Sequence, residues 1–111
     1  MGVGTRDWVS MLRAFYVAHD LPVGDPSMKN AHFHLALLTE EVGELASAVN
    51  KRKENKTVPD ELADVLYVAV GMAVSMGIDI ESVFRKTHHT NMRKKLAKLE
   101  ELHGRHNSAQ A

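Results

Sequence analysis

Two groups of acidic residues lie close together in the middle of the sequence, separated by a polar stretch. Glu40, Glu41 and Glu44 form the first group, and Glu61 and Asp64 form the second. Residues three or four positions apart on a helix are neighbours on one face, so each group would present adjacent carboxylates. Because like charges at this spacing repel each other, a half-buried arrangement of them predicts a bound cation. Carboxylate ligands without histidine or cysteine favour Mg2+, with Mn2+ as the next choice.

The acids are interleaved with apolar residues instead of forming a solvated run. The apolar positions recur at helical spacing at Leu38, Val42, Leu45 and Val49, and again at Leu62, Val65, Leu66, Ala69 and Met72. This period predicts two amphipathic helices whose acids flank an apolar stripe. In the alternative interpretation the glutamates are ordinary surface residues, and Asp60 and Glu61 merely favour a helix N-terminus. Two pairs with matched spacing on adjacent helices favour the metal site.

Four helices that can position these acids are predicted from caps, breakers and apolar period. They run over residues 6–18, 29–53, 59–76 and from 80 to Leu102 or His103. The capping residues are Thr5, Thr57 and Asp79, and the stops are Gly77 and Gly104. Connections this short predict antiparallel neighbours. We therefore expect an all-α, four-helix antiparallel bundle-like domain covering residues 1–111, with 107–111 as a disordered tail.

Gly43 and Gly71 lie inside the two acid-bearing helices, where each costs up to about 1 kcal/mol relative to alanine. Close approach of another helix is one explanation, and simple tolerance is the other. The sequence leaves both open.

Composition limits the classes of function. The chain has 111 residues, 44% of them hydrophobic and 25% charged, which is typical of one soluble domain. Fourteen basic and fourteen acidic residues cancel, so no overall field favours a nucleic acid polymer or an anionic membrane. No cysteine is present, which excludes thiolate chemistry, and no apolar run reaches membrane-spanning length. We expect a cytoplasmic protein that forms a homodimer or a dimer of dimers.

Basic and aromatic side chains are weaker candidates for binding. Lys51, with Arg52, Lys53 and Lys56, follows the first acids, although lysines near a helix C-terminus also complement its dipole. The aromatic residues are expected in the core, with stacking of a nucleobase at a subunit interface as the alternative for Trp8 or Phe33. The seven histidines do not have the spacing of a di-iron bundle, because only Glu100 and His103 form a Glu-x-x-His pair.

The two acidic segments carry a resemblance. EEVGELASAV followed by DELADVLYVAVGMA resembles the E-x-x-E, variable loop, E-x-x-D pattern of the MazG-like all-α nucleoside triphosphate pyrophosphohydrolases, relatives of the dimeric dUTPases and the phosphoribosyl-ATP pyrophosphohydrolases. Downstream, HHTNMRKKL resembles their His-x-x-Asn-Met-x-Lys element, and FYVAHDLPVGDPS is similar to the lead-in of some members. The resemblance covers about residues 9–99. It implies metal ligands at Glu41, Glu44, Glu61 and Asp64, and substrate-binding residues at His88, Asn91 and Lys94.

The resemblance also implies a reaction: Mg2+-dependent hydrolysis of a nucleoside triphosphate to the monophosphate and pyrophosphate, as in clearing of nucleotide pools. Glu40 and Glu41 are the expected catalytic acids, with Glu40 as the general base. Lys51 and Lys94 would neutralise the phosphate chain. The alternatives are hydrolysis of phosphoribosyl-ATP or of a nucleoside diphosphate, or a non-catalytic helical module that binds other proteins.

Overall fold

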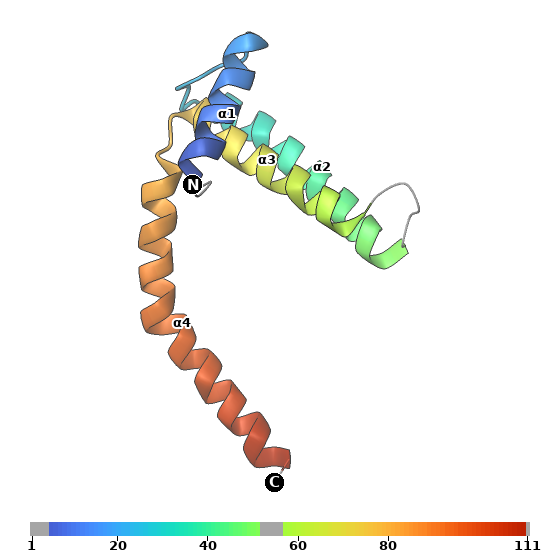
Figure 1. The fold of residues 1–111 in the computed structure, drawn as a ribbon, viewed down its shortest axis with the longest axis vertical. Helices are drawn as coiled ribbons and strands as arrows, with labels where there is room; N and C mark the ends of the chain where they lie inside the picture. Colours follow the sequence, from blue (N-terminus) through green and yellow to red (C-terminus); the bar gives the residue numbers. More distant parts are fainter. Residues whose placement is uncertain (1–4, 52–56, 111) are drawn as a thin grey trace. The chain divides into compact units, whose positions relative to one another are not determined.

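Four helices make up the chain over residues 5–51 and 57–110, which the computed structural model describes (Figure 1). They are α1 (Thr5–Ala18), α2 (Met28–Lys51), α3 (Val58–Met76) and α4 (Ile80–Gln110). No strand occurs within these two ranges, so the predicted all-α fold is confirmed. The chain divides into two compact units, one containing α1 to α3 and one consisting of α4. The single domain over residues 1–111 stays a prediction.

The helix bounds agree with the predicted ones except at one end. Helix α4 does not stop at Leu102 or His103, but continues through Gly104 to Gln110. Gly104 keeps a negative φ, and a helical glycine costs only about 1 kcal/mol relative to alanine, so it does not end the helix. The expected end of the second helix at Lys53 lies outside the described residues. Fraying of the tail from Asn107 stays a prediction.

No single helix within the described ranges is long and apolar enough to cross a membrane. Helices α3 and α4 pass that test only as a broken pair, by length and composition.

Caps set where α2 and α3 begin and where α3 ends. The Thr57 side chain accepts a hydrogen bond from the Asp60 amide at 3.3 Å, as predicted. Gly77 ends α3 with a φ of 74° in the left-handed region, also as predicted. The sequence analysis named no cap for α2, where the Asn30 amide donates to Ser27 Oγ at 3.2 Å. The Ser27 amide in turn donates to Asp25, and this hydrogen bond lowers the pKa of that carboxyl.

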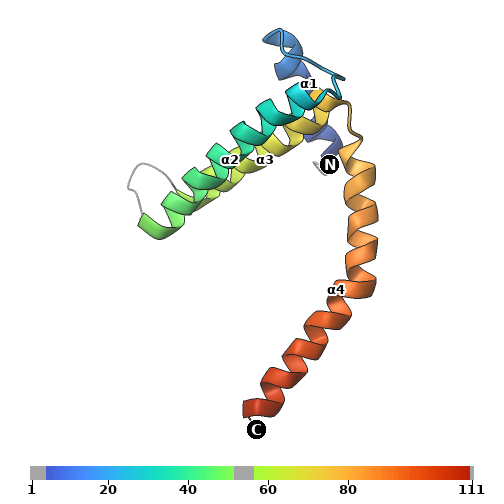
Figure 2. The ribbon, with the colours of Figure 1, turned by 180° about the vertical axis from the view of Figure 1, so that it is seen from behind.

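Helices α2 and α3 lie side by side and antiparallel, and α1 packs against α3 (Figures 1 and 2). A cluster of buried apolar residues lies between α1 and α3 and consists of Leu12, Tyr16, Val70 and Val74. The expectation that the aromatic residues lie in the core is therefore only partly correct, because Tyr16 is buried but Trp8 and Phe15 each remain 39% exposed. Those two rings are surface residues of this unit, not core.

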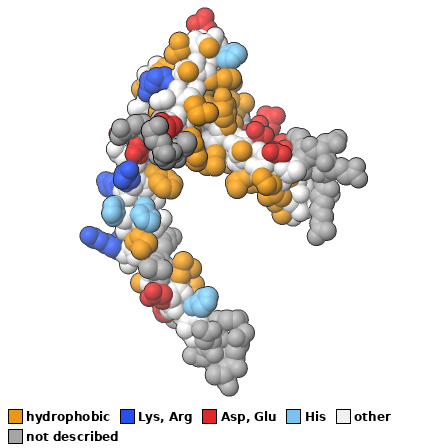
Figure 3. Space-filling model, in the orientation of Figure 1, with side chains coloured by type: hydrophobic (Ala, Val, Ile, Leu, Met, Phe, Trp, Pro, Cys, Tyr) orange, Lys and Arg blue, Asp and Glu red, His pale blue; other side chains and the backbone are white. Residues whose placement is uncertain are grey.

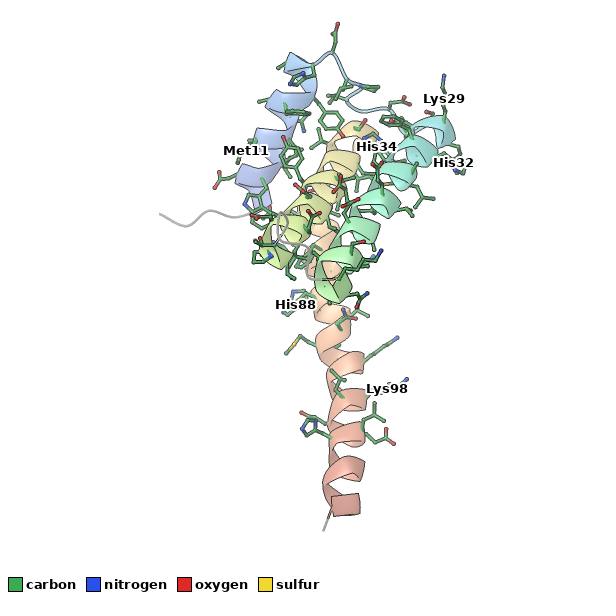
Figure 4. The ribbon with its side chains drawn as sticks, turned by 90° about the vertical axis from the view of Figure 1, so that its right-hand side faces the viewer. Met11, Lys29, His32, His34, His88 and Lys98 are labelled. Atoms are coloured by element: carbon green, nitrogen blue, oxygen red, sulfur yellow. The ribbon has the colours of Figure 1, made fainter. Side chains whose placement is uncertain are left out.

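A chain of buried hydrogen bonds joins all three helices. Tyr16 Oη lies 2.8 Å from His34 Nε2, and His34 Nδ1 lies 3.0 Å from the Asn30 carbonyl oxygen. Because a carbonyl oxygen only accepts, His34 donates to it through Nδ1, and Nε2 pairs with the Tyr16 hydroxyl. Burial raises the pKa of Tyr16, so its hydroxyl stays protonated. His34 is 1% exposed and points inward from α2, whereas His32 points outward (Figure 4).

The chain of hydrogen bonds continues from Asn30 to α3. The Asn30 side-chain amide donates to Ser75 Oγ at 3.0 Å and to the Asp25 carbonyl at 2.9 Å. Ser75 is fully buried and donates to the Pro22 carbonyl at 2.8 Å. Buried polar groups are stable only when they are hydrogen-bonded, so these contacts specify how α2 and α3 align.

Gly71 and Gly43 differ in how closely other atoms approach them, which decides between the two explanations left open by the sequence. A Cβ atom at Gly71 would lie 2.8 Å from Tyr16 Oη and 3.1 Å from Tyr16 Cε1. A Cβ atom at Gly43 would meet nothing within 4 Å among the described residues. Gly71 therefore permits the close approach of α1, and Gly43 is tolerated.

We predict that Gly71→Ala lowers the free energy of unfolding by about 1–3 kcal/mol, because the buried Tyr16 ring must shift and its hydrogen bond to His34 weakens. Gly43→Ala is the matched control, expected to raise that free energy by up to about 1 kcal/mol through helix propensity. Denaturant unfolding of both variants measures the difference. Equal stabilisation by the two substitutions would contradict the close packing of Tyr16 on Gly71.

Candidate metal centre

Three of the predicted acids converge on the α2–α3 hairpin. Glu41 on α2 and Glu61 and Asp64 on α3 each offer a carboxylate oxygen, and these atoms all lie within 4.8 Å of one another. Acidic side chains gather along the hairpin in Figure 3. Glu61 is buried, Glu41 is half-buried and Asp64 is exposed. The cluster thus reaches from the helix seam to the surface, as a site for a phosphate-bound cation requires.

The register of the hairpin explains this convergence. Asn30 on α2 is hydrogen-bonded to Ser75 on α3. Glu41 lies eleven residues after Asn30, and Asp64 lies eleven residues before Ser75. Eleven residues make about three helical turns, so both acids return to the faces that Asn30 and Ser75 occupy. Glu61 follows one turn beyond Asp64. The buried hydrogen bond between Asn30 and Ser75 therefore determines which acids meet.

Glu61 is the member of the cluster with the least exposure, at 3%. It interacts with other groups of the protein, and its Oε2 atom is in addition buried without a hydrogen bond from the described residues. Three negative carboxylates at this separation repel one another, and burial strengthens the repulsion. A divalent cation with oxygen ligands would offset that charge, so the residues present fit Mg2+ or a similar hard ion.

Two predicted acids lie next to the cluster without joining it. Glu44 is half-buried one turn beyond Glu41 on α2, and it is not among the three converging residues. Glu40 is exposed beside Glu41. Their roles as fourth ligand and general base stay predictions.

The predicted substrate-binding residues lie elsewhere on the described helices. Lys51 is exposed at the end of α2, and Arg52, Lys53 and Lys56 lie outside the described residues. His88, Asn91 and Lys94 are exposed on α4. They are three residues apart, so each is a neighbour of the next on the helix surface. Their contact with a substrate stays a prediction.

The histidines do not join the cluster within the described residues, where the converging group is made of carboxylates alone. His34, which the sequence analysis did not use, instead holds Tyr16 in the core. The signal that could have identified this role is the spacing of Asn30, His34 and Glu41 along one face of α2. That line of polar residues follows the inward side of the helix.

A sequence model of the family described as phosphoribosyl-ATP pyrophosphohydrolase matches residues 25–91, which is more than half of the chain and includes the three converging acids. The chain belongs to this family. The family is part of the MazG-like all-α nucleoside triphosphate pyrophosphohydrolase superfamily, so the resemblance seen in the acidic segments is confirmed.

One curated relative of this family member is the uncharacterized protein YpjD of Bacillus subtilis (strain 168). The two sequences are 39% identical over 64 residues. That region is 50% of this chain and 58% of YpjD, so the chain spans little more than half of its relative. No solved structure matches the chain significantly.

We predict that Mg2+ raises the melting temperature, because it binds the native cluster and not the unfolded chain. At a concentration one hundred times its Kd, the gain in unfolding free energy is about 2.7 kcal/mol. Glu61→Gln should abolish this gain and, without metal, should unfold at a higher temperature than the wild type because one repelling charge is gone. Thermal scans with Mg2+ and with a chelator test both effects.

Glu100→Gln, at an exposed position of α4, is the matched control. It should melt at the same temperature as the wild type, both with Mg2+ and with chelator. A melting temperature of the wild type that is the same with Mg2+ and with chelator would rule out the metal site.

Proposed function

We propose that this family member is a Mg2+-dependent pyrophosphohydrolase that cleaves a nucleoside triphosphate between its α and β phosphates, giving the monophosphate and pyrophosphate. The convergence of Glu41, Glu61 and Asp64 within 4.8 Å carries the proposal. Carboxylates cannot bind a polyphosphate directly, because both are anions, but they bind it through a shared divalent cation. Family membership supplies the type of bond that is broken.

Each acid has a proposed part in the reaction. Glu41, Glu61 and Asp64 hold Mg2+ or Mn2+, and Glu44 is the fourth ligand. A cation bound there supplies positive charge that offsets the phosphates and favours ionisation of the attacking water. Glu40 accepts the proton of that water, since it is exposed and adjacent to Glu41. The attack is in line with the leaving pyrophosphate.

The remaining predicted residues bind the substrate. Lys94 and Lys51 neutralise phosphate oxygens that the metal does not reach. Asn91, which has both a donor and an acceptor, and His88 bind the sugar or base. We also propose that the protein acts in the cytoplasm as a homodimer or homotetramer, consistent with the many exposed apolar side chains of this small chain.

Phosphoribosyl-ATP is a second candidate substrate, because the matching family is described by hydrolysis of that compound. Its triphosphate chain contains the same α–β anhydride bond, so the same acids would serve both reactions. The non-catalytic alternative is less well supported, because acids without a function on the surface need not converge as three carboxylates, one of them buried.

We predict that the protein releases pyrophosphate from a nucleoside triphosphate or from phosphoribosyl-ATP, with Mg2+ and not with chelator. Asp64→Asn should reduce kcat by roughly 100-fold or more, since it removes one charge that acts at the reacting phosphates. Pyrophosphate release from a panel of triphosphates measures this, with Glu100→Gln as the variant that should retain full activity. If folded protein releases no pyrophosphate from any of these compounds, the proposed reaction is wrong.

Lys94 and Lys98 offer a matched pair on α4, because both are exposed lysines of the same helix. We predict that Lys94→Ala raises KM about 10-fold or more through a lost charge-assisted contact to phosphate, whereas Lys98→Ala leaves KM unchanged. Steady-state kinetics of the two variants give the comparison. An equal increase of KM in the two variants would mean that the overall positive charge of α4, and not Lys94 itself, contributes to substrate binding.

A further inference from the structure

A groove of about 200 Å³ lies between α1 and α3. Trp8, Met11 and Leu12 line it from α1, and Leu66 and Tyr67 are among the residues that line it from α3. Hydrophobic side chains gather over these two helices in Figure 3. Trp8 is 39% exposed and Tyr67 is 42% exposed, so both aromatic residues of the groove are accessible. The metal centre uses neither of them.

The size of the groove selects a kind of ligand. A protein cavity of about 150 Å³ holds benzene, which is a single six-membered ring. At about 200 Å³, this groove has room for a ring system about a third larger, such as the fused rings of a purine. The indole and phenol rings provide surfaces on which a flat base stacks.

The groove lies next to the acidic cluster along α3. Asp64 belongs to the cluster, while Ala63 and Tyr67 line the groove. Tyr67 follows Asp64 by three residues, which is roughly 5 Å along the helix axis and about 60° around it. A nucleotide whose phosphates bind at Asp64 can therefore extend its base around α3 toward Tyr67.

We infer that this groove binds the purine base of the nucleotide, with Trp8 and Tyr67 as the stacking residues. The inference rests on the proposed function and adds the class of base and its position. It replaces the expectation that these rings belong to the core, because the structure leaves both accessible.

The single tryptophan of the chain makes the test direct, since all indole fluorescence comes from the groove. With chelator present, adenosine should quench Trp8, whereas ribose 5-phosphate, which has no base, should not. Tyr67→Leu keeps an apolar side chain but removes the ring, and should weaken adenosine binding roughly 5- to 100-fold. Phe84→Leu removes an exposed aromatic ring of α4 that does not line the groove and should leave adenosine binding unchanged.

Three outcomes are distinguishable, provided that circular dichroism shows both variants to be folded. Quenching by adenosine that is lost in Tyr67→Leu supports the groove, whether or not pyrophosphate is released. Pyrophosphate release from purine nucleotides without any response of Trp8 overturns the groove and leaves the proposed function intact. Trp8 emission that depends on protein concentration and not on adenosine also overturns the assignment of the groove to base binding. It would instead indicate that copies of the chain contact one another at the groove.

Discussion

The hydrogen bonds that run from Tyr16 through His34 and Asn30 to Ser75 are the constraint on which the first three helices depend. Apolar contacts alone would let α2 and α3 slide or rotate against each other with little change in buried area, because they have no direction. A buried amide or imidazole is stable only in the alignment that satisfies it. The network therefore selects one register for the hairpin out of several with similar packing.

That register determines whether the acids form a site. A shift of one residue along a helix turns each side chain by about 100° and would direct Glu41 away from Asp64. The same seam thus has two polar parts with opposite effects on stability. The hydrogen-bonded part stabilises the aligned hairpin, and the acidic part opposes it until a cation binds. The buried Glu61 is tolerable in the seam because the hydrogen-bonded Ser75, about four turns away on the same helix, holds the hairpin in register.

Sequence reasoning predicted the helices well, because caps, glycine stops and apolar period are local signals. Thr57 and Gly77 act as predicted because each interacts within its own helix end. It failed at Gly104, where a glycine without a following breaker does not stop α4. It did not assign His34, Asn30 and Ser75. The spacing of Asn30, His34 and Glu41 indicates a polar line on α2, but Tyr16 lies 18 residues from His34 and Ser75 lies 45 residues from Asn30, and no local pattern encodes these pairings. For the same reason the spacing of four acids did not distinguish the three that converge from Glu44.

Tyr16 connects the network to the groove as well. Trp8, Leu12 and Tyr16 are spaced by four residues, so they follow one face of α1. The hydrogen bond from Tyr16 to His34, made over Gly71, sets the rotation of α1 about its axis. That rotation turns Leu12 and Trp8 toward α3, where they line the groove. A larger residue at position 71 would displace Tyr16, and the groove would then change together with the core. The geometry of the groove is in this way coupled to the buried hydrogen bonds that also align the acids.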